Sequence, residues 1–213
     1  MNRKLIRLSK SSISNKEKDN VLKVLDKEYL GMGKEVEKFE KELSNYFERD
    51  AICVVNGTSA LQQAIQSIGI KKGDEILVQS LTFVASFQAI SASGAKPISC
   101  DIKPNSLTID IEDAKKRLTE RTKAIMPVHF AGTPGDLNEI YKFAEEYNLR
   151  VIEDAAHAFG SKYKSRNIGS IGDICCFSFD GIKNITCGEG GCIVTSDNVV
   201  LEKIKDSRLL GIK

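Results

Sequence analysis

Short apolar runs alternate with segments of helical periodicity along most of the chain. The apolar runs, which are typical of strands, lie at 51–55, 75–79, 97–100, 123–128, 150–153, 174–179 and 192–196. Segments with apolar residues at helical spacing follow near 58–68, 83–93, 111–119, 136–147 and 199–210. Continuous apolar runs indicate strands buried on both faces, and the alternation indicates parallel strands with helical crossovers. The pattern therefore predicts an α/β protein with a three-layer, mostly parallel sheet flanked by helices.

Two further helices are predicted before the first strand. Ser14 and Glu17 have the spacing of a capping box, and apolar residues at helical spacing follow as far as about Asp26. A second amphipathic helix covers residues 36–46, and residues 1–13 are expected to form an extended arm. Because the chain has no repeats and no low-complexity linkers, we expect one domain without an internal boundary.

Composition narrows the choice of partners and compartment. The 213 residues are 41% hydrophobic and carry a net charge of +2 with both signs mixed, so neither nucleic acid nor a membrane surface is expected as a partner. The N-terminus lacks the apolar core of a signal peptide, and none of the six cysteines forms a C-x-x-C motif. We therefore expect a cytoplasmic protein with reduced core thiols and no metal.

The stretch at 174–191 carries the strongest candidate for chemistry. An apolar run ends at Asp180-Gly181, Lys183 follows at once, and a glycine-rich turn leads into a second apolar run. A lysine held between buried strands is desolvated, which favours its neutral and nucleophilic amine. Such an amine can form a Schiff base with a carbonyl or with pyridoxal 5′-phosphate (PLP). A solvated loop lysine is the alternative for this segment taken alone.

Other polar segments follow strand ends, where ligands bind in sheets of this kind. Gly57, Thr58 and Ser59 come after the first strand and, with a helix expected to begin at Thr58 or Ser59, can cradle a phosphate or simply cap that helix. Ser178 ends its strand and can join the cradle. Phe83 opens a helix and can stack on a flat ring or belong to the core.

Two carboxylates, Glu153 and Asp154, end another buried strand, and His157 follows them. A carboxylate at this position can pair with a cationic ring nitrogen, which in a PLP enzyme is the pyridinium nitrogen. A pair of helix-capping carboxylates and a satisfied loop histidine are the alternatives. The other histidine, His129, also ends a strand and is interpreted as structural.

Several motifs in order along almost the whole chain resemble one family, the sugar-nucleotide aminotransferases of the DegT/DnrJ/StrS type within the fold-type I PLP enzymes. The matching stretches are Gly31-Met32-Gly33 with Phe39-Glu40, Asn56 to Leu61, Gly73-Asp74-Glu75, Thr82 to Ala85, Val128-His129 with Gly132, Glu153 to His157, Phe177-Ser178-Phe179, and Lys183-Asn184 with Gly188 to Gly191.

The resemblance implies a role for each matching residue. Lys183 matches the lysine that forms the Schiff base with PLP and then moves the proton, and Asp154 matches the partner of the pyridinium nitrogen. Phe83 matches the aromatic residue stacked on the cofactor ring. His157 occupies a position near the ring where relatives carry Gln or His. The phosphate would be bound by the segment around Gly57, with Thr58, Ser59 and Ser178.

The resemblance also implies a fold, an activity and partners. It implies an aspartate-aminotransferase-like PLP-binding large domain over residues 1–213, with the arm at 1–13 and with the family's smaller C-terminal domain absent. The implied activity transfers an amino group from glutamate to a nucleotide-linked keto-sugar, in amino-sugar, lipopolysaccharide or other cell-surface polysaccharide biosynthesis, by a homodimer.

The sequence has two alternative interpretations as to function. The first is a truncated, non-catalytic relative that binds PLP or a partner subunit without turnover. The second is a nicotinamide dehydrogenase, which is disfavoured because no G-x-G-x-x-G follows the first strand, and because Gly31-Met32-Gly33 has no strand before it.

Overall fold

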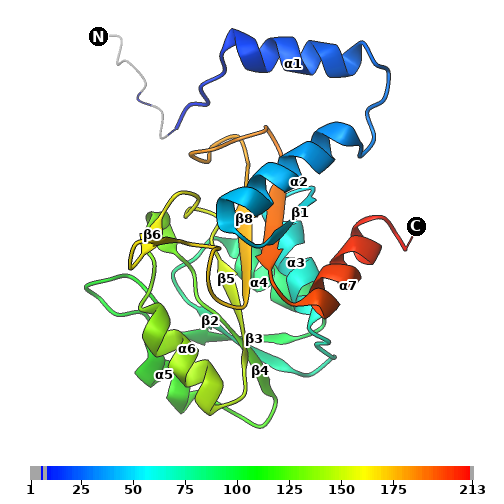
Figure 1. Ribbon diagram of the computed structural model, residues 1–213. Coiled ribbons are helices and arrows are strands. Elements are labelled where there is room, and N and C mark those ends of the chain that lie inside the picture. The colour runs from blue at the N-terminus through cyan, green and yellow to red at the C-terminus, as the bar shows by residue number, and fades with distance from the viewer. Residues whose placement is uncertain (1–5, 7–8, 212–213) are drawn as a thin grey trace.

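The computed structural model describes residue 6 and residues 9–211, so the arm expected over residues 1–13 lies partly outside the described residues. A seven-stranded sheet in the order β1-β9-β8-β5-β4-β2-β3 forms the centre of the molecule (Figure 1). Its strands are β1 (Asp50–Val54), β2 (Glu75–Gln79), β3 (Lys96–Cys100), β4 (Thr122–Met126), β5 (Arg150–Asp154), β8 (Ile174–Ser178) and β9 (Gly191–Thr195). Only β9 runs antiparallel to its neighbours in this sheet, which confirms the mostly parallel prediction.

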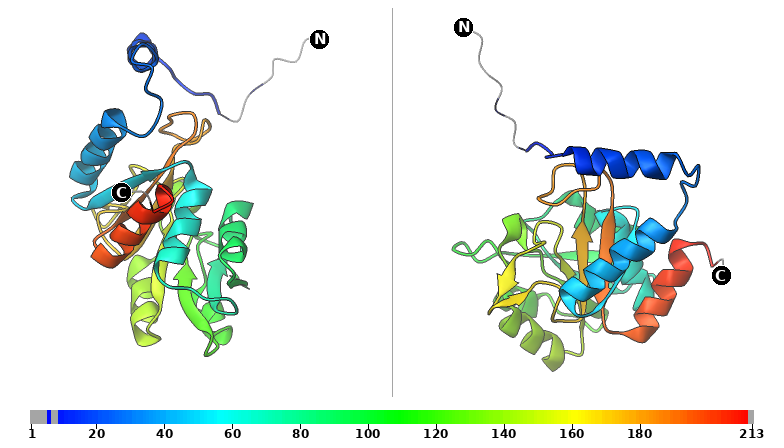
Figure 2. Two further views of the ribbon diagram at one scale, coloured as in Figure 1. Left: turned by 90° about the vertical axis from the view of Figure 1, so that its right-hand side faces the viewer. Right: turned by 45° about the horizontal axis from the view of Figure 1, so that its top comes forward.

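Helices cover both faces of this sheet (Figure 2). They are α2 (Lys34–Phe47), α3 (Gly57–Ser67), α4 (Val84–Ala92), α5 (Ile111–Lys116), α6 (Leu137–Glu146) and α7 (Asn198–Arg208), and α1 (Asn15–Leu25) precedes them in the chain. Apolar residues of α2, α5 and α6 pack in one core, and those of α3, α4 and α7 pack in another. Leu77 of β2 faces the first core while Ile76 and Val78 face the second, as the alternation of side chains along a strand requires. The three-layer prediction is confirmed.

The element boundaries differ from the expected ones at a few places. Helix α3 begins at Gly57 rather than at Thr58 or Ser59, because Asn56 caps it: the Asn56 Oδ1 atom accepts the backbone N–H of Ser59. A short hairpin of β6 (Lys162–Tyr163) and β7 (Arg166–Asn167) was not predicted. Its strands have two residues each, too few for an alternating pattern to be visible in the sequence.

Helix α1 stands apart from the layers that cover the sheet (Figure 1). Its N-terminus has the expected capping box between Ser14 and Glu17, and it contains no buried residue. Its apolar residues Val21, Leu22 and Leu25 are all about half exposed or more. The segment before it contacts the body through the Ser11 hydroxyl, which donates to the Gly181 carbonyl at 2.6 Å.

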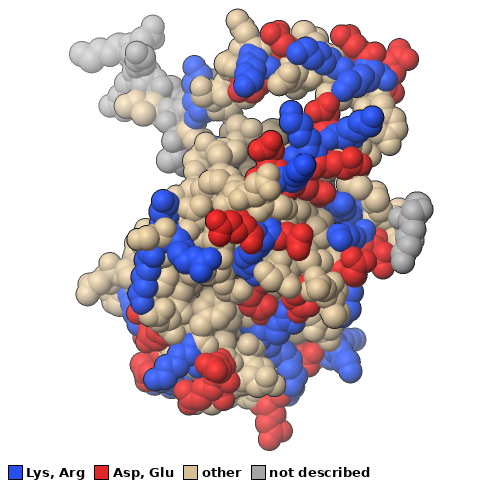
Figure 3. All heavy atoms as spheres, in the orientation of Figure 1, with Lys and Arg blue, Asp and Glu red and all other residues tan. Residues whose placement is uncertain are grey.

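The described surface carries both signs of charge side by side. Figure 3 shows Lys and Arg interspersed with Asp and Glu over the face it presents. Within the residues that the structure describes, no helix is long and apolar enough to cross a membrane.

The six cysteines are free thiols, and Cys100, Cys175, Cys176 and Cys192 are buried. Burial raises the pKa of the Cys100 thiol to about 12 and the pKa of Cys175 well above its ordinary range. Buried thiols that stay protonated are poor nucleophiles, so these cysteines act as core residues, as expected.

Candidate active site

A cavity of about 530 Å³ opens at the carboxyl ends of the parallel strands. The segments that follow β1, β2, β4, β5 and β8 line it, which is where parallel α/β sheets place their ligands. The residues predicted for the site that line this cavity are Gly57, Thr58, Phe83, Asp154, His157, Ser178 and Lys183. The sheet thus gathers groups that are spread over most of the sequence.

Ser59 is the predicted site residue that does not line the cavity. Its backbone N–H is used by the Asn56 cap at 2.9 Å, and its hydroxyl accepts the Gln63 side-chain amide at 2.9 Å. Both polar groups are therefore engaged within α3. Gly57 and Thr58 occupy the first turn of the helix, where backbone N–H groups have no partner inside the helix and can bind an anion.

Close backbone approach explains two of the glycines at this end of the sheet. A Cβ on Gly57 would lie 2.8 Å from the Ser178 Cβ, so only glycine lets the start of α3 pack against the end of β8. A Cβ on Gly191 would lie 2.5 Å from the carbonyl carbon of Asn56. The glycine-rich turn before β9 and the loop after β1 are therefore adjacent parts of one cradle.

Asp154 ends β5 with its side chain on the wall of the cavity, and it is 5% exposed. Its Oδ2 atom accepts the Ser86 hydroxyl at 2.6 Å, and its Oδ1 atom accepts the Ala156 backbone N–H at 3.2 Å. The Asp154 backbone N–H donates to the Pro127 carbonyl, and the Asp154 carbonyl accepts the His129 N–H. Sequence reasoning missed Ser86, because no local pattern marks its contact with a residue 68 positions away.

Glu153 points away from Asp154, because neighbouring strand residues face opposite sides of a sheet. It is fully buried, with Oε2 2.7 Å from the His129 Nε2 atom and Oε1 accepting the Tyr141 hydroxyl at 2.7 Å. The Tyr141 oxygen in turn accepts the Asp173 backbone N–H. Burial first, and then the Glu153 charge, raise the pKa of Tyr141 far above its ordinary value. Glu153 thus belongs to a network beneath the cavity, and it contacts His129, which lines the cavity itself.

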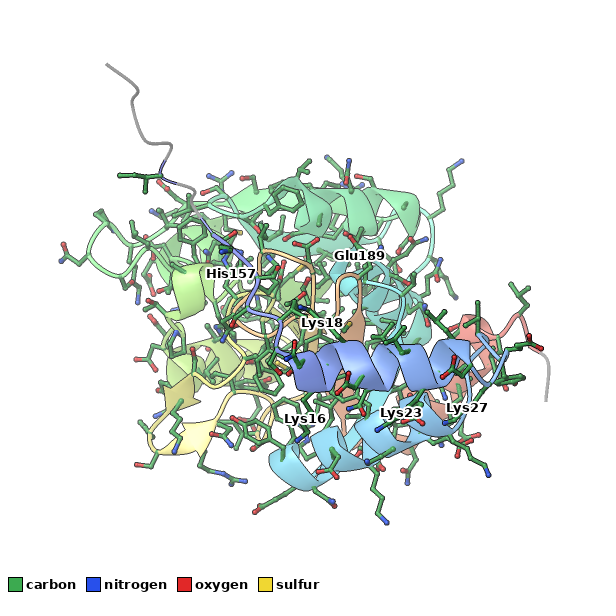
Figure 4. All side chains as sticks on the ribbon, turned by 90° about the horizontal axis from the view of Figure 1, so that it is seen from above. Lys16, Lys18, Lys23, Lys27, His157 and Glu189 are labelled. Carbon is green, nitrogen blue, oxygen red and sulfur yellow. The ribbon has the colours of Figure 1, made fainter. Side chains whose placement is uncertain are left out.

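His157 lines the cavity in its neutral form. Its Nδ1 atom accepts the Ala131 backbone N–H at 3.3 Å, so the ring proton resides on Nε2. Burial and then the nearby Lys183 charge lower the pKa of His157 below its ordinary 6.5, against the opposing effect of Asp154. Figure 4, viewed from above, labels His157 and Glu189 on the face crossed by α1. At neutral pH His157 therefore offers an N–H donor.

Lys183 follows β8 in a tight turn. Its backbone N–H donates to the Asp180 carbonyl at 3.0 Å, and the Asp180 side chain accepts the Ile182 N–H at 3.0 Å. The Lys183 side chain is half-buried and lines the cavity.

Phe83 lies on the opening of the cavity as the N-cap residue of α4. The Phe83 side chain is 68% exposed, so it is not the core residue that was the alternative reading. An exposed aromatic ring beside a polar cavity is available to a flat ligand.

The residues present fit PLP. A half-buried lysine amine, a carboxylate held as a hydrogen-bond acceptor, a helix N-terminus with nearby hydroxyls and an open aromatic face converge on one cavity. They match the aldehyde, ring nitrogen, phosphate and ring face of that cofactor in turn. Among residue 6 and residues 9–211 there is no group of three or more His, Cys, Asp or Glu side chains arranged to hold a metal ion.

The sequence matches the DegT/DnrJ/EryC1/StrS aminotransferase family over residues 11–213. The chain belongs to this family. A GDP-perosamine synthase of Escherichia coli O157:H7 is 42% identical over 203 residues, which cover 94% of this chain and 56% of that protein. The dTDP-3-amino-3,4,6-trideoxy-alpha-D-glucose transaminase of Streptomyces venezuelae is 39% identical over 193 residues, which cover 90% of this chain and 51% of that protein. The chain thus spans about half the length of these curated relatives.

Solved structures of DegT-family relatives agree with this fold. DesV of S. venezuelae matches with a TM-score of 0.90 and 38% identity, over 93% of this chain and 54% of that chain. Spr1654 of Streptococcus pneumoniae in its PLP form matches with a TM-score of 0.90 and 28% identity, over 94% of this chain and 57% of that chain. The predicted aminotransferase-like fold is confirmed, and PLP is the cofactor with which the family works.

Proposed function

We propose that this chain is the PLP-binding part of an aminotransferase that moves an amino group from an amino acid to a nucleotide-linked keto-sugar. One observation carries the proposal: Lys183, Asp154 and His157 meet at one cavity beside the N-terminus of α3. The named activities of the relatives support the sugar nucleotide as substrate class. Glutamate as amino donor is part of the same proposal and follows from the family resemblance.

Different residues of the chain would have different roles in this reaction. When bound, PLP supplies an aldehyde carbon that takes up the amino group and a ring that accepts electrons as a substrate C–H bond breaks. The Lys183 amine would hold the cofactor covalently and, once released, would take a substrate proton and return it at the neighbouring carbon. The Asp154 carboxylate would hold the protonated ring nitrogen. His157 would offer its Nε2–H as a donor, because its Nδ1 atom accepts the Ala131 N–H.

The phosphate would be bound at the other end of the cavity. Backbone N–H groups of Gly57 and Thr58, the Thr58 hydroxyl and the Ser178 hydroxyl would hold it, at the positive end of the α3 dipole. Ser59 was expected here as well, and it would act indirectly by engaging the Asn56 cap.

A second candidate is a chain that binds PLP or a partner without turnover. We propose that residues 1–213 correspond to the large, cofactor-binding domain, and the half-length match supports this assignment. The intact Lys183 and Asp154 favour the catalytic reading, because a binding-only protein does not require a proton-transferring amine.

We also propose a homodimer that acts in the cytoplasm in cell-surface polysaccharide biosynthesis. The exposed apolar residues Val21, Leu22 and Leu25 of α1 support association, since an amphipathic helix with no buried residue is stabilised by a partner. Sedimentation equilibrium tests this part of the proposal. A monomer at micromolar concentration would contradict it.

The first experiment is the visible absorbance spectrum of the chain mixed with PLP, before and after glutamate is added. We expect a yellow band with the wild type, bleached by glutamate, and no band with Lys183→Ala. The control is Lys142→Ala, which removes an exposed lysine from α6 and should leave the band unchanged. A band that glutamate does not change supports the binding-only candidate. An equal band in Lys183→Ala contradicts the assignment of Lys183.

A further inference from the structure

Ser86 of α4 and Thr82, which precedes the N-cap residue of that helix, place two hydroxyl groups in line with the Asp154 carboxylate. The Ser86 hydroxyl donates to Asp154 Oδ2 at 2.6 Å, and the Thr82 hydroxyl lies 2.7 Å from the Ser86 oxygen. Ser86 is fully buried and Asp154 nearly so. Because Ser86 has one proton and gives it to the carboxylate, its oxygen accepts the Thr82 proton. The result is a directed chain from Thr82 through Ser86 to Asp154, here called the hydroxyl relay.

The hydroxyl relay limits the rotation of the Asp154 side chain, which the hydrogen bonds of the Asp154 backbone do not restrain. Hydrogen bonds to Pro127 at 2.9 Å and from His129 at 3.0 Å fix the Asp154 main chain to the segment after β4. The side chain can still rotate about its own bonds. Of its two described contacts, the one from Ala156 N–H to Oδ1 is the longer at 3.2 Å, and the one from Ser86 is short and fully enclosed. Ser86 therefore decides where the carboxylate points.

Helical serines ordinarily return their hydroxyl to the helix itself. Ser93, at the other end of α4, does so and donates to the Ala89 carbonyl at 2.8 Å. Ser86 instead directs its proton across to β5, to a residue 68 positions away in sequence. This difference between two serines of one helix indicates a role for Ser86 that helix stability does not require.

Thr82 connects the relay to the cavity wall. Thr82 lines the cavity beside Phe83, and Phe83 is the N-cap residue of α4. The segment at 82–86 therefore carries the aromatic ring that faces the cavity and the donors that orient Asp154. A shift of this segment would move both together.

We propose that Ser86 and Thr82 are positioning residues, which hold the Asp154 carboxylate in the orientation that would face the ring nitrogen of a bound cofactor. The cofactor part of this statement rests on the proposed function, whereas the hydroxyl relay itself concerns only the chain. Hydrogen bonds to a charged acceptor are stronger than those between neutral groups, and they favour the charged form. Loss of Ser86 should therefore weaken cofactor binding although Ser86 itself need not touch the cofactor.

The test is a double-mutant cycle between Ser86→Ala and Asp154→Asn, with PLP dissociation constants measured by absorbance titration. We expect Ser86→Ala to raise the dissociation constant about tenfold in the wild-type background and by less than about twofold in Asp154→Asn. Thr82→Val, which removes only the outer hydroxyl, should raise it about threefold. The matched control is Ser93→Ala, for which no change is expected.

Urea unfolding of the same variants without cofactor provides a readout that does not depend on PLP. Ser86→Ala should lower the midpoint by about 0.5 M in the wild-type background and leave it nearly unchanged in Asp154→Asn. Equal shifts in both backgrounds would overturn the relay. If the effect of Ser86→Ala on the urea midpoint depends on Asp154 but the PLP dissociation constant does not change, the positioning role is overturned. If the wild-type chain binds no PLP, the proposed function fails for this chain, and the unfolding cycle still decides whether the relay exists.

Discussion

The floor of the cavity and its rim are built in opposite ways. The floor is formed by Asp154, which is buried and accepts a hydrogen bond from the buried Ser86 hydroxyl behind it. The rim consists of Phe83, Ile182 and Lys183, of which Phe83 and Ile182 are each more than 60% exposed. The polar groups of Asp154 and Ser86 find their hydrogen-bond partners within this chain. The rim presents exposed apolar surface, which only a ligand or another segment can cover.

This difference shows where the free energy of each part comes from. Floor residues stabilise the fold and the site together, since an unsatisfied buried carboxylate or hydroxyl costs free energy. Rim residues contribute little to folding and are free to contribute to binding. Substitutions in the floor and below it should therefore change stability, and substitutions in the rim should change affinity.

The largest expected effect comes from below the floor. Glu153→Ala would leave the Tyr141 hydroxyl and the His129 Nε2 atom buried without their shared acceptor. We expect the free energy of unfolding to fall by about 3 kcal/mol, as measured by urea denaturation. Glu145→Ala, an exposed position on α6, is the control and should change it by less than about 0.5 kcal/mol. A loss of similar size in both variants would refute the contrast.

At the rim, we expect a smaller effect, and it should change the affinity for PLP rather than the stability of the fold. Phe83→Ala removes a largely exposed ring, so the free energy of unfolding should change by less than about 0.5 kcal/mol. The dissociation constant of PLP should rise about tenfold, because a stacked ring contributes roughly 1 kcal/mol beyond its buried area. Phe177→Ala, a fully buried ring of β8, should instead cost about 3 kcal/mol or more in stability. If Phe83→Ala unfolds the chain as readily, the rim belongs to the core.

The smallest expected effect is a dependence of stability on pH, which comes from His157 on the cavity wall. The folded chain lowers the pKa of His157, chiefly by burial and then by the Lys183 charge. A histidine of this kind binds its proton more readily in the unfolded chain, so its contribution to stability is complete above pH 6.5 and is lost as pH falls through that value.

Urea midpoints between pH 7.5 and pH 5.5 measure this contribution. The wild type should lose more stability over this interval than His157→Gln, which cannot take up a proton there. Because His157 is only half-buried, we expect a modest difference. Parallel pH profiles for the two proteins would show that His157 does not titrate differently in the folded state.

Local pattern predicted much of this molecule. Apolar runs located the strands of the central sheet to within one or two residues at each end, because a strand buried on both faces requires unbroken apolar sequence. The capping box at Ser14 was also visible, since it depends on neighbours close in sequence. Such features are properties of short segments, whereas the close approaches of Gly57 to Ser178 and of Gly191 to Asn56 join segments far apart in the chain.

Contacts between distant segments were not predictable from the pattern. Ser86 reaches Asp154 from 68 residues away, and nothing near Ser86 marks it as different from Ser93. Ser59 bonds to the Asn56 cap and to Gln63 and does not line the cavity, although Gly57 and Thr58 before it do.

The sequence by itself determined the α/β class, the order of the elements and the residues whose chemistry defines the site. Burial pattern and residue type are local, and they carry that information directly. Only the tertiary structure decided which groups meet, which carboxylate of the pair at 153–154 faces the cavity, and which hydroxyl orients it. Those outcomes depend on sheet order and on the alternation of side chains across the sheet, and they are defined only once all the strands have paired.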